Sequence, residues 1–424
     1  MKALFTIVAR NYVGLARVLR DSVARHGDWS FFIFTADDWD DLPSEQVPQD
    51  IISARQALAW PEARWQSMAF QYNLVEFCTA IKPGCFQFLM QQKGYTEVVY
   101  VDPDVYFFGS PDALFDELAK TSILLTPHIL DCQIPFKGDY PDHLFLLNGT
   151  FNLGFVGVKK DRAGSLFLSW WNDRLESGCF FDNDRGMATD QKWTNLLPAL
   201  FTEQELTICR KRGWNMAPWN YHERKVIAHD HSFSVTDREA DQSAEPLVFV
   251  HFSGYDYRGF MQQEVSHKNE NATRFPDLQP IFEAYGKALA ASAFSEFSGI
   301  PYFYGYFQDG KPILQFHRRI YRRLYETEGY KSNPFRLGPG SFHAMLQRKR
   351  MLIKAGSGSS PDKLTNKNLS GFDSQFKLIQ WFFRVIFFFI GIRRYSLMVR
   401  FFRRFFTEEN QLFLLDKKSG NKLQ

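Results

Sequence analysis

Short apolar runs alternate with segments of helical spacing in the first part of the chain. Residues 4–9, 31–35 and 97–102 are rich in Val, Ile, Phe and Tyr, which is typical of strands. Apolar positions in residues 15–24 recur at the three- and four-residue steps of a helix. Strands that alternate with helices predict an α/β fold with a mostly parallel sheet flanked by helices. The same reasoning predicts strands at 122–126, 154–158 and 247–252, and helices at 163–176 and after Ser110-Pro111.

The alternation fades near residue 265, where aromatic segments of helical spacing begin. We therefore predict an α/β domain over 1–265 and a helical subdomain over 266–350. The run GSGSSP at 356–361 and the polar residues after it predict a flexible linker over 351–372. The remaining residues, 373–424, form a basic, Phe-rich tail.

The tail differs from the rest of the chain in its charge. The whole chain of 424 residues has a formal charge of +3, but residues 341–424 contain 16 Lys+Arg against 5 Asp+Glu. Ten phenylalanines and Trp381 alternate with basic residues between 376 and 406, where no acidic residue occurs. This pattern predicts an amphipathic helix that lies flat on an anionic membrane surface. The most apolar stretch, 378–392, contains Gln380 and Arg384 and is shorter than the roughly 20 residues of a spanning helix.

An alternative for the tail is that its Phe face packs on the protein's own core or on a second copy. Nucleic acid is not an expected partner, because no recognised binding module accompanies the basic residues.

The overall composition excludes disorder and small disulfide scaffolds. The chain is 45% hydrophobic and 23% charged, which is typical of globular proteins. Its five cysteines are odd in number and lack C-x-x-C spacing, which favours a reducing compartment. The first residues lack the continuous apolar core of a secretion signal. We therefore expect a cytoplasmic protein that binds the inner face of the membrane.

Two carboxylates follow the predicted strand at 97–102. Asp102 and Asp104 flank Pro103, and ligands of open parallel sheets gather at the carboxyl ends of strands. Carboxylate oxygens suit Mg²⁺ or Mn²⁺, which could bridge to a diphosphate and neutralise it as it leaves. The plain alternative is a solvated turn. His251 ends another predicted strand and is a candidate third ligand, although a lone histidine there is more often a core residue.

Five short motifs occur in an order that resembles a known family. They are Asn11-Tyr12, Asp102-Pro103-Asp104, Asn152-Leu153-Gly154, Asp190-Gln191 and His251-Phe252-Ser253-Gly254. This set is similar to that of GT-A fold glycosyltransferases, which use nucleotide-sugars. It is most similar to the retaining family 8, which includes bacterial lipopolysaccharide galactosyl- and glucosyltransferases and the glycogenins. The resemblance covers about residues 1–265 and implies that this region is the catalytic domain.

The resemblance implies a role for each matching residue. Tyr12 would stack on the base of a UDP-sugar and Asn11 would bind near it. Asp102, Asp104 and His251 would hold the metal, and Gly254 would let the backbone approach the diphosphate. Asn152 and Asp190 would bind hydroxyls of the donor sugar. Gln191 would stabilise the transition state, and a front-face displacement with retention is the mechanism expected.

The sequence departs from the family pattern at two places. Arg10 stands where the family has an acidic residue, which leaves room for a base other than uracil. The Lys-Pro pair expected after Gly254 is absent, so Arg258 or Lys268 is the candidate cation for the diphosphate.

Two further segments are open to more than one interpretation. Residues 214–224 combine aromatic, amide and charged groups and could bind sugar rings, or could form a surface corner held by tryptophans. Lys82 could reach a phosphate, but its position before Pro83 favours a solvated helix end.

The sequence thus favours a metal-dependent hexosyltransferase that acts on a glycan or lipid-linked acceptor. A sugar-nucleotidyltransferase is an alternative, but it should have a Gly-rich loop after the first strand, where this chain has only Gly14. The other alternative is a noncatalytic carbohydrate-binding or scaffold protein at the membrane surface.

Overall fold

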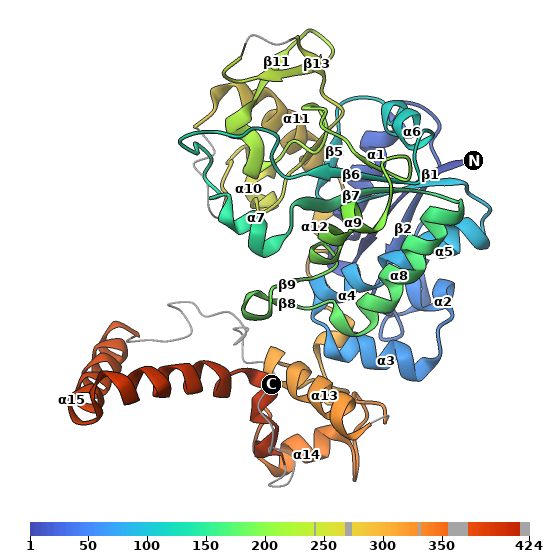
Figure 1. Cartoon of the computed structure of the whole chain (residues 1–424). Helices are drawn as coiled ribbons and strands as arrows, with labels where there is room; N and C mark the ends of the chain where they lie inside the picture. Colours follow the sequence, from blue (N-terminus) through green and yellow to red (C-terminus); the bar gives the residue numbers. More distant parts are fainter. Residues whose placement is uncertain (241–242, 268–273, 330–331, 355–371, 416–424) are drawn as a thin grey trace. The chain divides into compact units, whose positions relative to one another are not determined.

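The computed structural model describes residues 1–240, 243–267, 274–329, 332–354 and 372–415, and the chain divides into two compact units (Figure 1). Unit 1 comprises Met1–Ala59 and Leu74–Tyr302, and unit 2 comprises Trp60–Asn73 and Phe303–Gln424. The boundary predicted near residue 265 falls inside unit 1, where helix α11 (Gln279–Ala290) packs on helix α10 (Tyr257–Met261) and on the core.

Unit 1 is built around a mixed sheet whose strands follow the order β10-β6-β7-β4-β1-β2-β3. Only β7 runs antiparallel to its neighbours β4 and β6, whereas the other pairs are parallel. The bounds are β1 Lys2–Val8, β2 Phe31–Thr35, β3 Ile52–Ser53, β4 Glu97–Val101, β6 Ile123–Pro127, β7 Phe151–Lys159 and β10 Leu206–Ile208. The predicted mostly parallel sheet is confirmed.

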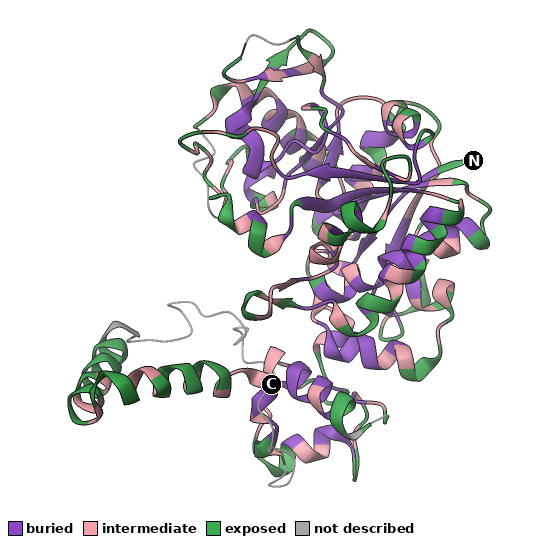
Figure 2. Cartoon of the chain, viewed as in Figure 1, coloured by how far each residue is buried: buried purple, intermediate pink, exposed green. Residues whose placement is uncertain are grey.

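Alternating residues of the central strands face two helical layers. Leu4 and Val99 lie in one apolar cluster with residues of α1 (Val13–Ala24) and α6 (Asp112–Leu118). On the opposite face, the ring of Phe5 packs edge-on against Phe86 of α5 (Lys82–Gln91) and Tyr100 of β4. Figure 1 shows α4 (Leu74–Ala80), α5 and α8 (Arg162–Gly178) together on that second side. Because both faces are covered, the central strands are almost wholly buried (Figure 2).

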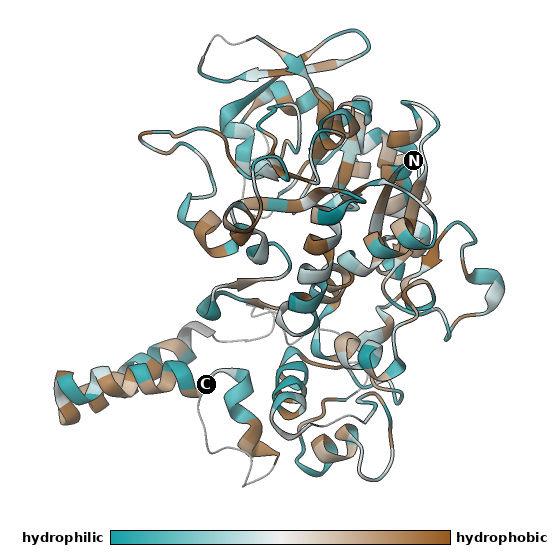
Figure 3. Ribbon diagram, turned by 45° about the vertical axis from the view of Figure 1, so that its right-hand side comes forward, coloured by the Kyte–Doolittle hydropathy of each residue, from teal (hydrophilic) through white to brown (hydrophobic). Residues whose placement is uncertain are grey.

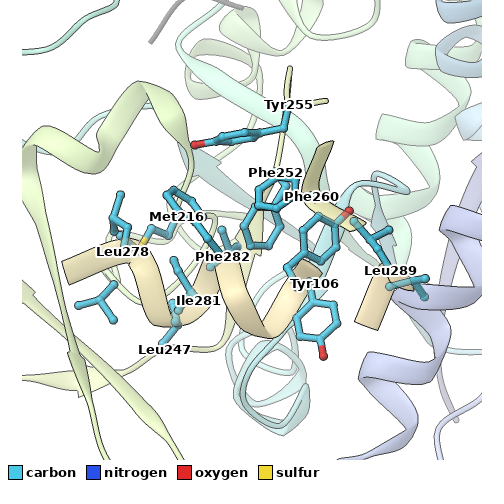
Figure 4. Close-up of a cluster of buried hydrophobic side chains, with 14 of the residues drawn as sticks. Tyr106, Met216, Leu247, Phe252, Tyr255, Phe260, Leu278, Ile281, Phe282 and Leu289 are labelled. Carbon is cyan, nitrogen blue, oxygen red and sulfur yellow. The ribbon is translucent and has the colours of Figure 1, made fainter. Parts of the chain in front are cut away.

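A second, short sheet joins two distant parts of unit 1. Strand β5 (Val105–Phe107) follows β4 directly and pairs antiparallel with β14 (Phe249–His251). Next to this pair lies an aromatic cluster that includes Phe252, Tyr255 and Phe260 (Figure 4). The ring of Phe252 also stacks on that of Tyr285, with 4.0 Å between the ring centroids. This packing fixes the end of β14 against the end of β4.

The remaining elements of unit 1 were less visible in the sequence. Between residues 54 and 91 the sequence indicates only a helix end at Lys82, and it does not predict the antiparallel sheet β11-β12-β13. The bounds are α2 Ala54–Leu58, α7 His143–Asn148, α9 Leu197–Leu200, α12 Phe294–Phe297, β8 Phe181–Asp182, β9 Met187–Ala188, β11 Arg224–Ala228, β12 Phe233–Asp237 and β13 Glu245–Pro246.

Unit 2 is a helical body with its own apolar core. Its helices are α3 (Glu62–Gln71), α13 (Gln315–Glu328) and α14 (Phe342–Arg348). The buried guanidinium of Arg318 donates to the carbonyl oxygens of Ala69, Phe70 and Tyr72, and so satisfies the C-terminal end of α3. The core also includes Leu412, which belongs to the short helix η8 (Glu408–Leu414).

The predicted basic helix is present as α15 (Phe372–Phe405), and it bends sharply at Gly391. Gly391 has a left-handed backbone (φ 67°, ψ 169°), and the two arms contact each other where Tyr395 meets Phe383 and Phe387. Apolar and basic residues alternate along α15, which exposes most of its large apolar side chains (Figure 3). By length and composition alone, residues 374–405 could cross a membrane. The predicted linker lies mostly outside the described residues.

Candidate active site

The two strand pairs at the centre of unit 1 bring three metal-ligand side chains together. Asp102 and Asp104 lie in the turn between β4 and β5, and β14 delivers His251 opposite Val105. His251 Nε2 lies 3.0 Å from Asp104 Oδ1 and 3.7 Å from Asp102 Oδ2. One ligand atom from each of the three residues falls within 4.8 Å of the others. Two carboxylates and one imidazole nitrogen form a donor set that fits Mn²⁺ or Mg²⁺.

A carboxamide on β7 sets the orientation of the histidine ring. Asn152 Oδ1 lies 3.2 Å from His251 Nδ1, and it also accepts from the Asn215 side chain and the Gly154 N–H, both at 3.1 Å. Because Asn152 Oδ1 can only accept, His251 Nδ1 carries the proton and Nε2 is left as the metal-binding nitrogen.

Glycine at position 154 makes this close approach possible. A Cβ at Gly154 would lie 2.4 Å from Cε1 of the His251 ring. The ring therefore occupies the space above β7 that a larger residue would fill.

The imidazole and the two carboxylates of the cluster stabilise one another's charged forms. Burial alone would lower the pKa of His251, but the carboxylates of Asp104 and Asp102 raise it above its ordinary value. Burial would raise the pKa of Asp104, whereas His251 and the hydroxyl of Tyr257 lower it overall. Tyr257 donates to Asp104 Oδ2 at 3.1 Å, and Tyr100 donates to Asp102 Oδ1 at 2.6 Å. Both carboxylates are thus held in place by phenols.

Lys82 and Asp190 form a buried ion pair beside the metal cluster. Lys82 Nζ lies 2.8 Å from Asp190 Oδ2 and 3.9 Å from Asp102 Oδ1, and it donates to the carbonyl oxygen of Leu153 at 2.9 Å. Burial raises the pKa of Asp190, and Lys82 acts in the opposite direction. The interpretation of Lys82 as a solvated helix end is wrong, because the residue is only 1% exposed. The carboxylates of Asp190 and Asp102 at the end of β4 stabilise its buried ammonium group.

Gln191 is fixed at both ends of its carboxamide. Its Oε1 accepts from the N–H of Leu153 at 3.1 Å, and its Nε2 donates to the carbonyl oxygen of Asn148 at 2.9 Å. The Nδ2 atom of Asn152 lies 3.5 Å from Gln191 Oε1. Gln191 and Asn152 both line a cavity of about 260 Å³ in unit 1.

Tyr12 and Asn11 lie in the turn η1 (Arg10–Tyr12) after β1, on the same side as the metal cluster. The ring of Tyr12 packs edge-on against the ring of Tyr257, with 6.3 Å between the ring centroids, and the hydroxyl of Tyr257 donates to Asp104. The buried side chain of Arg10 is occupied by other contacts. It pairs with Asp37 and Asp41 and donates to the carbonyl oxygen of Pro301.

The glycine after His251 has the backbone expected of a close approach. Gly254 has a φ of +82°, which favours glycine, and a Cβ there would lie 2.7 Å from the ring of His267. Arg258 is exposed on α10, and Lys268 lies outside the described residues.

Residues 214–224 are neither a surface corner nor a loop open to solvent. Trp214 and Trp219 are buried, and Trp219 packs edge-on against the ring of His251 at 5.2 Å. Sequence reasoning also missed Tyr100, Tyr257 and Asn215. Alternation along β4 places Tyr100 on the same face as Asp102 and could have indicated it, whereas no local pattern indicates the other two.

The strand order and the site resemble those of one class of protein. A mixed sheet with one antiparallel strand, and a D-x-D pair after its central strand, are the features of GT-A glycosyltransferases. The mostly parallel α/β fold that the sequence predicts is therefore confirmed, and its strand order and carboxylate pair agree with the resemblance to this class.

The chain belongs to the family of the uncharacterized protein YfnF of Bacillus subtilis (strain 168). The two are 31% identical over 219 residues, which cover 50% of this chain and 67% of YfnF. The uncharacterized protein YfnD of the same organism is 25% identical over 254 residues, covering 59% of this chain and 76% of YfnD. No family model matches the chain.

Solved structures of glycosyltransferases are also similar to the chain at low sequence identity. The galactosyltransferase LgtC, in complex with donor and acceptor sugar analogues, is 15% identical with a TM-score of 0.39, covering 69% of this chain and 96% of LgtC. GlyE of Streptococcus pneumoniae is 15% identical with a TM-score of 0.35, covering 73% of this chain and 68% of GlyE. Mouse xyloside xylosyltransferase 1 is 11% identical with a TM-score of 0.34, covering 60% and 98%.

Proposed function

We propose that the protein is a metal-dependent hexosyltransferase that takes its sugar from a nucleoside diphosphate sugar. The observation that carries the proposal is the meeting of Asp102 and Asp104, from the turn after β4, with His251 of β14, whose ligand atoms lie within 4.8 Å of one another. A bound divalent cation would neutralise the diphosphate as it leaves. Tyr100 and Tyr257 donate to the two carboxylates and Asn152 accepts from the His251 ring, so the three ligands are held in place and the cost of assembling the site is reduced.

The base of the donor would bind at Asn11 and Tyr12. The Tyr12 ring adjoins Tyr257, which is one hydrogen bond away from the metal ligand Asp104. Stacking on Tyr12 would therefore place the diphosphate at the metal, with Gly254 beside it. Because Arg10 uses its charge on Asp37 and Asp41, a uracil base needs no contact with that guanidinium.

Transfer would proceed with retention through a front-face displacement. The bond between the anomeric carbon and the diphosphate oxygen breaks, the acceptor oxygen forms the new bond, and its proton passes to the leaving phosphate. Gln191 would stabilise the positive charge that develops on the sugar ring, since its carboxamide is fixed by Leu153 and Asn148. Asp190 lies beside it, paired with Lys82, and would bind a hydroxyl of the donor sugar.

The acceptor would be a glycan or a lipid-linked sugar at the cytoplasmic face of the membrane. Helix α15 exposes large apolar side chains among seven basic ones, which are Lys377, Arg384, Arg393, Arg394, Arg400, Arg403 and Arg404. An apolar and cationic surface of this kind suits anionic lipid, and an enzyme bound there meets its acceptor at high local concentration.

Nucleotide binding tests the donor site. Isothermal titration of a panel of nucleoside diphosphates should give one base that binds in the presence of Mn²⁺ and at least about tenfold more weakly in EDTA. The Asp102→Asn/Asp104→Asn variant should lose the metal-dependent part, while Asp116→Asn, an exposed carboxylate on α6, should bind as the wild type does. Equal binding by the double variant would contradict the proposal.

Two other functions have less support from the sequence and the structure. A sugar-nucleotidyltransferase would need a Gly-rich phosphate loop after β1, where the chain instead forms the short turn η1. A noncatalytic carbohydrate-binding protein would not need three ligands held by their own hydrogen-bond partners, and it would tolerate Asp104→Ala.

A further inference from the structure

The cavity of about 260 Å³ beside the metal cluster has a wall of a particular chemical kind. Every described residue that lines it is uncharged. Aromatic rings come from Tyr140, Phe145 and Trp219, and carboxamides come from Asn148, Asn152 and Gln191. Aromatic faces and amides bind the C–H face and the hydroxyls of a sugar ring.

We propose that this cavity binds one uncharged sugar ring and excludes sugars that carry a carboxylate or a phosphate. The inference rests on the proposed function and adds to it the chemical class of the sugar. Its basis is the size of the cavity, the chemistry of its wall and its distance from the metal cluster.

The size restricts the occupant to a small ring. Pockets that hold drug-sized molecules have volumes of roughly 300–1,000 Å³. The cavity of about 260 Å³ is smaller, which suits a single monosaccharide ring.

The wall offers nothing to neutralise an anion. His128 is the one lining residue of the described set that titrates near neutrality, and burial lowers its pKa to about 4, so its ring is neutral. Lys82, the basic side chain beside the metal cluster, is already paired with Asp190. A sugar carboxylate in the cavity would lose its hydration without gaining a counter-charge.

Two buried polar atoms of the described wall residues have no hydrogen-bond partner. Among the residues that the structure describes, the indole N–H of Trp219 and Oδ1 of Asn148 make no hydrogen bond. One atom donates and the other accepts, and a sugar hydroxyl can do both. Trp219 is only 8% exposed, so water at the surface does not satisfy its N–H.

The cavity adjoins the reacting centre. Asn152 hydrogen-bonds to the metal-ligand candidate His251, and the ring of Trp219 packs against the same imidazole. A sugar in the cavity would therefore lie next to a diphosphate on the metal. It would be the sugar that is transferred or the sugar that accepts it, and both have the same chemistry.

Steady-state kinetics with Trp219→Phe identifies which sugar occupies the cavity. This substitution keeps the ring and removes the N–H, and should raise KM about 3- to 10-fold for the ligand whose sugar lies there. A rise for the donor alone assigns the transferred sugar, and a rise for the acceptor alone assigns the acceptor sugar. Trp170→Phe on α8, outside the cavity, is the matched control. An unchanged KM for both substrates would overturn the proposal.

The second arm tests the charge class. For the substrate that Trp219→Phe identifies, the neutral hexose is compared with its hexuronic acid, in which only C6 is oxidised. The wild type should use the acid with a kcat/KM lower by more than about 100-fold. Equal use of the acid would overturn the proposal even if the enzyme is a transferase. Metal-dependent binding of the nucleoside diphosphate alone, which carries no sugar to be transferred, reports separately on the proposed function.

Discussion

At the residue scale, the site depends on what Asn152 does. The family resemblance assigns this residue to the donor sugar, and that role stays a prediction. In the structure its Oδ1 is occupied by three donors, namely the side chains of His251 and Asn215 and the Gly154 N–H. Only its Nδ2 faces the cavity side, near Gln191 and His128. Orientation of the His251 ring is thus a second task of Asn152.

Substitution of Asn152 should change the affinity for metal. Asn152→Leu removes the acceptor and should weaken Mn²⁺ binding about 10- to 100-fold, the usual effect of losing a partner of a metal-ligand histidine. Asn152→Asp keeps an acceptor and should bind Mn²⁺ as well as the wild type does. Isothermal titration with Mn²⁺ measures the affinity, and ¹⁵N spectra of the His251 ring in the metal-free protein report the proton on Nδ1.

The account of Asn152 fails if the leucine variant, shown to be folded by circular dichroism, binds Mn²⁺ with wild-type affinity. Retention of the Nδ1–H signal in that variant would show that another group selects the tautomer.

A second residue-scale prediction concerns His128 and the loss of stability in acid. Burial lowers its pKa from the ordinary 6.5 to about 4, against the hydrogen bond to the Thr150 carbonyl, which raises it. The unfolded chain takes up this proton below pH 6.5 and the folded chain only below about pH 4. The contribution to stability is therefore complete above pH 6.5 and is lost as the pH falls towards 4, by about 3 kcal/mol in all.

Urea denaturation at pH 7 and pH 4.5 checks this dependence. The free energy of unfolding of His128→Gln should fall by about 2 kcal/mol less than that of the wild type over this interval. His222, whose pKa burial also lowers to about 4, contributes the same slope to both proteins. Identical slopes for the variant and the wild type would show that His128 is not held neutral by the fold.

At the residue scale, the sequence indicated the neighbouring side chains of the site best where a side chain follows a strand. Asp102, Asp104 and His251 were predicted as ligands, and the structure brings them together because β5 pairs with β14. Lys82 was misjudged because its helix begins at a buried acidic site, and such an environment arises only from tertiary packing. Tyr257 lies 153 residues from Asp104 and Asn215 lies 63 residues from Asn152, so no local pattern marks either partner.

At the element scale, strand β7 and helix α15 depart from simple patterns. Strand β7 is antiparallel within an otherwise parallel sheet, and a run of apolar residues has the same appearance in either direction. Its direction matters for function, because it presents Asn152 and Gly154 to His251 at the end of β4. Helix α15 was predicted, but its bend was not, since Gly391 is a single residue within a continuous apolar and basic pattern.

The predicted tail contains two parts with different roles. Helix α15 exposes its apolar side chains, whereas η8 after it packs on α13, with Leu412 in the core of unit 2 and Glu409 beside Arg319 and Arg322. Deletion of 373–424 would therefore remove part of the folded body of unit 2 together with α15. Point substitutions in α15 test membrane binding more cleanly.

Charge reversal on the second arm of α15 should release the protein from anionic membranes. Each basic residue near such a surface contributes about 1 kcal/mol. The triple variant Arg400→Glu/Arg403→Glu/Arg404→Glu should therefore bind vesicles that contain phosphatidylserine more than about 100-fold more weakly than the wild type. The matched variant with Lys at the same three positions should bind normally.

Co-sedimentation with vesicles, with and without phosphatidylserine, measures the difference. If the Glu variant still sediments with anionic vesicles, the tail does not bind through its charges. Sedimentation of the wild type as a dimer in solution, with no binding to vesicles, would support the alternative that α15 packs on a second copy.

At the scale of the whole molecule, the sequence predicted the α/β class and the ligands at one sheet edge but not the division into units. Residues 60–73 belong to unit 2 although they interrupt unit 1 in the sequence, because Arg318 of α13 caps the end of α3. Such a contact between positions about 250 residues apart leaves no periodic signal in either segment. The apolar pattern could predict helices in both places, but not that they share a core.

The central claim is that a divalent cation held by Asp102, Asp104 and His251 drives the release of a nucleoside diphosphate from its sugar. The most direct measurement is the rate of that release from a panel of nucleoside diphosphate sugars, in Mn²⁺ and in EDTA, for the wild type, Asp104→Asn and Asp116→Asn. The account predicts release from one donor in Mn²⁺ by the wild type and Asp116→Asn. It predicts a rate lower by at least about 100-fold in EDTA or with Asp104→Asn. Release that is equally fast in EDTA, or equally fast with Asp104→Asn, would contradict it.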